Sequence, residues 1–152
     1  MQTRLPPPLI FALAALIVGL LWKFAPALQW DVPSALANIL GSVFVIGGLF
    51  YIIAALGLFK KKETTILPFT PEETTALVTD GVYSVTRNPM YLGMALVVMG
   101  LVIITRQPLG ILALLAACAY LTVFQIKPEE RALQRIFGQD YVDYKTRVRR
   151  WI

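Results

Sequence analysis

The chain has 152 residues, of which 57% are hydrophobic and only 15% are charged. Soluble domains carry about 25% charged residues, so this composition predicts a membrane protein, and the length predicts one domain. The net charge is +5, but the basic residues flank long apolar runs, which favours contact with membrane lipids over nucleic-acid binding. Histidine is absent and Cys118 is the single cysteine, which excludes His-based zinc sites, Ser-His-Asp triads, Cys clusters and disulfides within the chain.

Four apolar runs predict four transmembrane helices, at residues 9–25, 35–59, 90–105 and 109–126. The second run is long enough to cross the hydrocarbon core, and the last two are close to the lower limit of about 17 residues. The first run lacks the small-residue cleavage pattern of a signal peptide, so we expect it to be kept as a helix. The sequence therefore predicts an all-α membrane protein with a single domain over residues 1–152.

Small residues in the second run are spaced so that another helix can approach closely. They are Gly41, Ser42, Gly47 and Gly48. Small residues are typical of helix contacts in membranes, but they also occur in apolar helices that make no such contact. The sequence leaves both interpretations open.

Basic residues gather after the second and fourth runs. Three lysines occupy positions 60–62, and seven of the fourteen basic residues lie in 127–152. Because basic residues favour the cytoplasmic side, we expect the connector 60–89, the C-terminal segment 127–152 and the N-terminus to be cytoplasmic. The turns at 23–33 and 106–108 are expected on the other side. In a bacterium, the membrane would be the inner membrane.

The connector leads into the third run through Arg87, Asn88 and Pro89. Pro89 is predicted to begin a helix and Asn88 to cap it. Arg87 can bind a carboxylate through two parallel hydrogen bonds, beside the free N–H groups of the helix start. It can equally be a membrane anchor whose charge extends to the lipid headgroups.

The C-terminal segment is predicted to begin with a helix that has Pro128 in its first turn and stops near Gly138. Glu129 and Glu130 lie at the start of this helix. Two adjacent carboxylates at this position can simply complement the positive end of the helix. They can also attract a cationic group, or one of them can act as a base when it is desolvated.

The connector and C-terminal segment resemble the isoprenylcysteine carboxyl methyltransferase family, whose superfamily includes the phospholipid N-methyltransferases. The matching motifs are residues 65–68, Leu77-Val78, 81–83, 87–93, Pro128-Glu129-Glu130, Phe137-Gly138, Tyr141, Tyr144 and 147–151. Several ordered motifs at consistent spacing are more specific than one short match.

The resemblance implies an integral membrane methyltransferase that binds S-adenosylmethionine between the last membrane helices and the C-terminal segment. Carried over by position, the implied cofactor-binding residues are Leu77, Val78, Gly81, Tyr83, Arg87, Asn88, Pro89, Tyr91, Glu129 and Glu130.

Arg87 and Glu130 are the implied catalytic residues. Arg87 is assigned to an anionic group, either the methionine carboxylate of the cofactor or an acceptor carboxylate. Glu129 would hold the amino group or ribose of the cofactor, and Glu130 would share that role or take a proton from the acceptor. Asn88 stands where many members of the family have His, and an amide can donate a hydrogen bond but cannot shuttle a proton.

The acceptor is expected to be a lipid-like or amphipathic small molecule: an isoprenoid thioether acid, a lipid amine, or a small hydrophobic thiol or acid. The sequence does not indicate the oligomeric state. An alternative enzyme class is an NADPH-dependent membrane reductase of steroid-reductase type, which cofactor binding would distinguish. A small exporter of lipophilic cations would be expected to keep an acidic residue within a span, yet all nine Asp and Glu residues lie outside the four runs.

Overall fold

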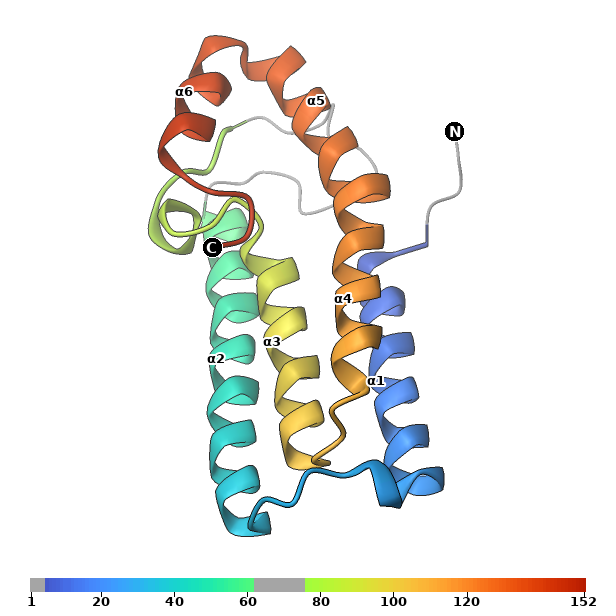
Figure 1. The fold of residues 1–152 in the computed structure, drawn as a ribbon. Coiled ribbons are helices and arrows are strands. Elements are labelled where there is room, and N and C mark those ends of the chain that lie inside the picture. The colour runs from blue at the N-terminus through green and yellow to red at the C-terminus, as the bar shows by residue number, and fades with distance from the viewer. Residues whose placement is uncertain (1–4, 62–75) are drawn as a thin grey trace.

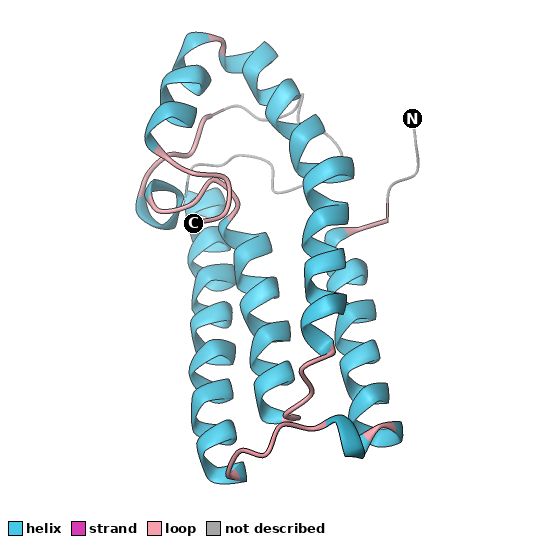
Figure 2. Ribbon diagram, in the orientation of Figure 1, coloured by secondary structure: helices cyan, strands magenta, loops and turns pink. Residues whose placement is uncertain are grey.

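The computed structural model describes residues 5–61 and 76–152, and the secondary structure of these residues is helical, without strands (Figure 2). The bundle consists of α1 (Pro7–Phe24), α2 (Ser34–Lys61), α3 (Pro89–Ile104) and α4 (Gly110–Leu121), which lie side by side in Figure 1. Three stretches are long and apolar enough to cross a membrane: Pro7–Phe24, Ser34–Lys60 and Gly110–Phe137. Helix α3 is a shorter apolar helix. The predicted all-α membrane class is confirmed.

Helix α4 continues through a π-helical segment (Thr122–Ile126) into α5 (Lys127–Phe137). Pro128 has no N–H to donate to the carbonyl of Phe124, four residues earlier, which favours a wider turn at this point. Gly138, with φ +54°, then separates α5 from α6 (Gln139–Arg147). The predicted positions of Pro128 and Gly138 at the two ends of this helix are confirmed. As a result, α5 and α6 extend over the ends of α2 and α3 (Figure 1).

Helix α3 is the centre of the bundle, because it contacts α1, α2 and α4. The main core contains Val18 of α1, Val98 and Val102 of α3, and Leu114 and Leu121 of α4, all nearly or fully buried. Helices in a membrane are held together by close packing rather than by the removal of water. The shape of these contacts therefore matters more for stability than their hydrophobicity.

Two pairs of glycines bring α2 and α3 into backbone contact. A Cβ added to Gly48 would lie 2.5 Å from the carbonyl oxygen of Gly93, and one added to Gly100 would lie 2.6 Å from the carbonyl oxygen of Gly41. A Cβ added to Gly47 would meet no atom within 4 Å. The close-contact interpretation is therefore confirmed for Gly41 and Gly48, but it is wrong for Gly47.

We expect Gly48→Ala to lower the thermal stability of the detergent-solubilised protein, by about 1 to 3 kcal/mol, because the backbone of α3 blocks the added methyl group. Gly47→Ala is the matched control, since the same change there meets open space and gains helix propensity. Equal melting temperatures for the two variants would contradict the glycine contact between α2 and α3.

The opposite end of the bundle is closed by the turn between α3 and α4. Arg106 adopts a positive φ of 56°, and its carbonyl accepts a 2.8 Å hydrogen bond from the backbone N–H of Trp30. The Gln107 side chain is fully buried and donates from Nε2 to the carbonyls of Leu21 and Ala25. Gln107 therefore joins the end of α1 to the end of α3 and is inaccessible to solvent.

Candidate active site

The predicted site residues lie at the end of the bundle where α2 ends, α3 begins and α5 and α6 cross over (Figure 1). A 3₁₀ turn, η3 (Gly81–Ser84), precedes α3, and residues 148–152 return from α6 to the same place. Residues 62–75, which include the matching motif at 65–68 and part of the predicted connector, lie outside the described residues. The structure thus brings the segment before α3 next to α5, α6 and residues 148–152, although the two regions are far apart in the sequence.

Arg87 is the buried cation of this site. Its side chain is 9% exposed, and its Nη2 atom lies 3.0 Å from Oε1 of Glu130. Its Nε and Nη1 atoms are buried and have no hydrogen-bond partner among the described residues. A buried polar group without a partner costs free energy, so two such donors on one guanidinium indicate a position for an anion.

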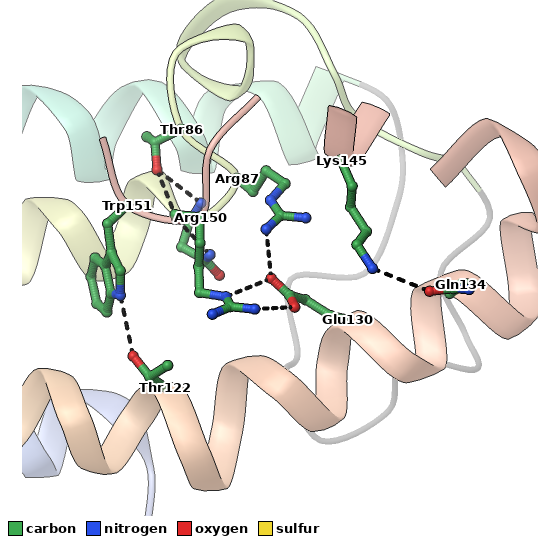
Figure 3. Close-up of polar contacts among 9 residues, drawn as sticks. Thr86, Arg87, Thr122, Glu130, Gln134, Lys145, Arg150 and Trp151 are labelled. Atoms are coloured by element: carbon green, nitrogen blue, oxygen red, sulfur yellow. Dashed lines mark hydrogen bonds and ion pairs between the residues drawn. The ribbon is translucent and has the colours of Figure 1, made fainter. Parts of the chain in front are cut away.

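Glu130 lies between two arginines. Arg150 donates from Nε to Oε1 at 2.9 Å and from Nη2 to Oε2 at 2.8 Å, while Arg87 contacts Oε1 (Figure 3). Burial disfavours the charged form of a carboxyl, but the two hydrogen bonds from Arg150 and the nearby charge of Arg87 favour it. Glu130 is therefore ionised at neutral pH and is a weak base.

Glu129 points to a different set of partners. Its Oε1 atom accepts hydrogen bonds from the Tyr91 hydroxyl, at 2.9 Å, and from Nε2 of Gln125. Adjacent helical positions point about 100° apart, which explains why the two glutamates face different neighbours. Tyr91 is buried in the first turns of α3, so Glu129 is attached to α3 while Glu130 is attached to residues 148–152 through Arg150.

Asn88 is the N-cap residue of α3 by position, but its side chain makes no capping hydrogen bond, so the predicted capping role of this side chain is wrong. Its Nδ2 atom instead donates to the carbonyl of Arg150 at 2.9 Å. The Thr86 hydroxyl donates to the same carbonyl and accepts from the Asn88 backbone N–H. The amide is used here to hold residues 148–152 against the start of α3, which begins at the buried Pro89.

The connector residues Val78 and Tyr83 are buried against the end of α2. They form a cluster with Ala55, and the Tyr83 ring packs edge-on against Phe59 at 5.5 Å between ring centroids. Gly81 has a φ of +58°, a conformation that favours glycine, and lies beside Leu58.

Two further contacts join the connector to α6. The Tyr144 hydroxyl donates to the Tyr83 carbonyl at 2.6 Å, and Leu77 packs against the cluster of Tyr141 and Tyr144. Residues 77–83 of the connector therefore bridge α2 and α6. A cofactor-binding role for Leu77, Val78, Gly81 and Tyr83 stays a prediction.

The sequence did not single out several individual residues of the site, among them Thr86, Thr122, Gln125 and Arg150. Thr122, in the π-helical segment, accepts a 3.2 Å hydrogen bond from Nε1 of Trp151 (Figure 3). Arg150 lies twenty positions after Glu130. Side chains on one helix meet only when they are three or four positions apart, so the sequence did not indicate this contact. The sequence indicated the segment only as a whole, through its basic residues and through the family motif at 147–151.

Comparison with known proteins identifies the family. Residues 36–140, well over half of the chain, match the family model described as phospholipid methyltransferase. The chain is 26% identical over 136 residues to a protein-S-isoprenylcysteine O-methyltransferase of Saccharomyces cerevisiae, a match that covers 90% of this chain and 57% of the yeast protein. It is 32% identical over 85 residues to protein-S-isoprenylcysteine O-methyltransferase B of Arabidopsis thaliana, a match that covers 56% of this chain and 43% of the plant protein.

The chain therefore spans about half the length of the curated relatives it matches. No solved structure shows significant similarity to it. The matched range contains α3, the Arg87 motif and both glutamates, but it ends before Arg150. By sequence, this chain belongs to the phospholipid methyltransferase family, within the superfamily that also contains the isoprenylcysteine methyltransferases.

Proposed function

We propose that this chain is an S-adenosylmethionine-dependent methyltransferase whose acceptor reaches the site from the membrane. The observation that carries the proposal is Arg87, a buried cation with two donors free of partners in the described part of the chain, at the start of α3. A planar guanidinium with two free N–H groups suits a carboxylate, which fits the methionine end of the cofactor or an acidic acceptor.

The neighbouring residues fit the remaining charges of that cofactor. Glu129, attached to Tyr91 and Gln125, offers a carboxylate for an ammonium or ribose hydroxyl. Glu130 contacts the guanidinium groups of both Arg87 and Arg150, so we assign it to holding Arg87 rather than to taking a proton. When bound, S-adenosylmethionine would supply an activated methyl group, and the residues around it would align the acceptor and exclude water.

The acceptor in this proposal is an amphipathic molecule with an apolar tail. The site lies at one end of a bundle of apolar helices, so a lipid-like molecule would reach it from the side while its polar end stays near Arg87. The family description and the names of the relatives support lipid-related acceptors. An isoprenoid thioether carboxylate, a lipid amine and a small hydrophobic acceptor all meet this description.

Calorimetric titration of the purified protein with S-adenosylmethionine, S-adenosylhomocysteine and NADPH tests the cofactor. We expect the first two to bind and NADPH to leave no signal. Binding of NADPH alone would contradict the proposal and favour a membrane reductase. Transfer of a labelled methyl group to an isoprenylated cysteine or to an aminophospholipid in vesicles then distinguishes carboxylate from amine acceptors.

We also propose that the end of the bundle that carries Arg87 faces the cytoplasm, because the lysines at the end of α2 and the basic residues of α5 and α6 lie at that end. In a Cys118→Ala background, a cysteine at the exposed Asp140 should be labelled from the cytoplasmic side and one at the exposed Asp31 from the other side. Gln107 is unsuitable for such labelling because it is buried. Labelling of Asp31→Cys only from the cytoplasmic side would contradict this orientation.

A further inference from the structure

Arg150 binds Glu130 through two parallel hydrogen bonds, whereas Arg87 contacts Glu130 through one nitrogen atom. Arg150 contacts both carboxylate oxygens, through Nε at 2.9 Å and Nη2 at 2.8 Å, whereas Arg87 contacts Oε1 alone, through Nη2 (Figure 3). A carboxylate beside a single arginine favours the paired contact of two parallel hydrogen bonds. Here Arg150 makes this paired contact. The Nε and Nη1 atoms of Arg87 have no hydrogen-bond partner among the described residues.

The backbone of Arg150 is fixed by the segment that carries Arg87. Thr86 and Asn88, the two neighbours of Arg87, both donate side-chain hydrogen bonds to the Arg150 carbonyl, at 3.2 and 2.9 Å. The Arg87 backbone N–H donates to the carbonyl of Arg149 at 3.0 Å. The two arginines therefore reach Glu130 from two segments whose backbones are joined by these hydrogen bonds.

Trp151 fixes the other side of residues 148–152. Its Nε1 atom donates to Thr122 in the π-helical segment, and its ring packs against the main core of the bundle. The helix that carries Glu130 and the segment that carries Arg150 are therefore joined a second time. The hydrogen bond and the packing of Trp151 therefore oppose a movement of the Arg150 backbone away from Glu130.

The three side chains of this cluster, Arg87, Arg150 and Glu130, together carry one net positive charge. Two guanidinium groups surround one carboxylate, and the side chains of Arg87 and Glu130 are only 9% and 10% exposed. Without Arg150, the Glu130 carboxylate would be free to turn both oxygens toward Arg87, which would neutralise it and fill its free donors.

We infer that Arg150 is a positioning residue that holds Glu130 on its own guanidinium and thereby keeps two donors of Arg87 available to an anionic ligand. This inference deepens the proposed function and rests on it for the identity of the ligand, but the open anion site can be tested separately.

The experiment compares Arg150→Gln with Arg147→Gln, which removes a charge nearby from an exposed side chain that bonds to the Asp143 carbonyl within α6. We expect Arg150→Gln to weaken the binding of S-adenosylhomocysteine by about tenfold or more, the size expected for loss of a charge-assisted contact. Arg147→Gln should bind like the wild type. Wild-type affinity in Arg150→Gln would overturn the inference.

A double-mutant cycle with Glu130→Gln separates positioning from general stability. If Arg150 acts through Glu130, adding Arg150→Gln to Glu130→Gln should cost little further affinity, whereas additive losses would overturn the inference. If Arg150→Gln does not fold, Arg150→Lys replaces it in the experiment, because Lys keeps the charge but cannot make two parallel hydrogen bonds to a carboxylate. We expect Arg150→Lys to bind less tightly than the wild type, and unchanged affinity would again overturn the inference.

Acetate, a carboxylate without the rest of the cofactor, tests the anion site by itself. We expect it to raise the melting temperature of the wild type more than that of Arg150→Gln at equal ionic strength. If S-adenosylhomocysteine does not bind the wild type but acetate shows this difference, the proposed function fails and the inference stands. If acetate shows no difference either, the inference fails as well.

Discussion

Arg87→Lys is expected to weaken the binding of S-adenosylhomocysteine by roughly 10- to 100-fold although it keeps the positive charge. Arg87 already uses Nη2 for Glu130 and has Nε and Nη1 buried without partners in the described part of the chain. A lysine has one compact ammonium group and cannot present a planar pair of donors to a ligand while it holds Glu130. Calorimetric titration of the variant in detergent measures the loss.

Arg106→Lys is the matched control, because it makes the same chemical change at the opposite end of the bundle. The Arg106 side chain donates to the carbonyl of Val32 and to Gln29, far from α5 and α6. We expect its ligand affinity to equal that of the wild type. If Arg87→Lys also binds both S-adenosylmethionine and S-adenosylhomocysteine normally, Arg87 serves only the ion pair with Glu130 and the proposed site is wrong.

Features that depend on neighbouring residues could be predicted from the sequence. Long apolar runs predicted the membrane helices, and the positions of Pro128 and Gly138 predicted the ends of α5. These features need only local chemistry: hydrophobic length, a missing N–H group and a positive φ. The glycines were ambiguous, because whether Gly47 or Gly48 touches α3 depends on the rotation of α2, which a uniformly apolar helix does not reveal.

Features that depend on residues 148–152 could not be predicted. The sequence suggested that Asn88 would cap α3, since Asn is favoured at this position. In the structure the Asn88 amide donates to the carbonyl of Arg150 instead and makes no capping hydrogen bond. That carbonyl is brought there by the turn at Gly138 between α5 and α6, although Asn88 and Arg150 are sixty-two residues apart in the sequence. The contact between Glu130 and Arg150 also depends on this return of residues 148–152 to the start of α3.

The contact of Glu130 with residues 148–152 also changes what the acidic pair is expected to do. The resemblance assigned Glu129 to the amino group or ribose of the cofactor, and Glu130 to the same role or to taking a proton from the acceptor. In the structure, Glu130 joins two cations, one of them buried, and Glu129 accepts hydrogen bonds from two neutral side chains, Tyr91 and Gln125. The two glutamates should therefore affect different measurements.

Glu130→Gln is expected to destabilise the ligand-free protein by about 3 kcal/mol or more, because it leaves the buried Arg87 without its anionic partner. Glu129→Gln should change the ligand-free stability by less than about 1 kcal/mol, since an amide oxygen can still accept from Tyr91. Its effect should fall on S-adenosylhomocysteine, whose ammonium group would lose a charged partner, with affinity weakened about tenfold. Thermal melting without ligand and calorimetric titration separate the two effects. If both substitutions change affinity and stability slightly and equally, the acidic pair only complements the start of α5, and neither glutamate belongs to a cofactor site.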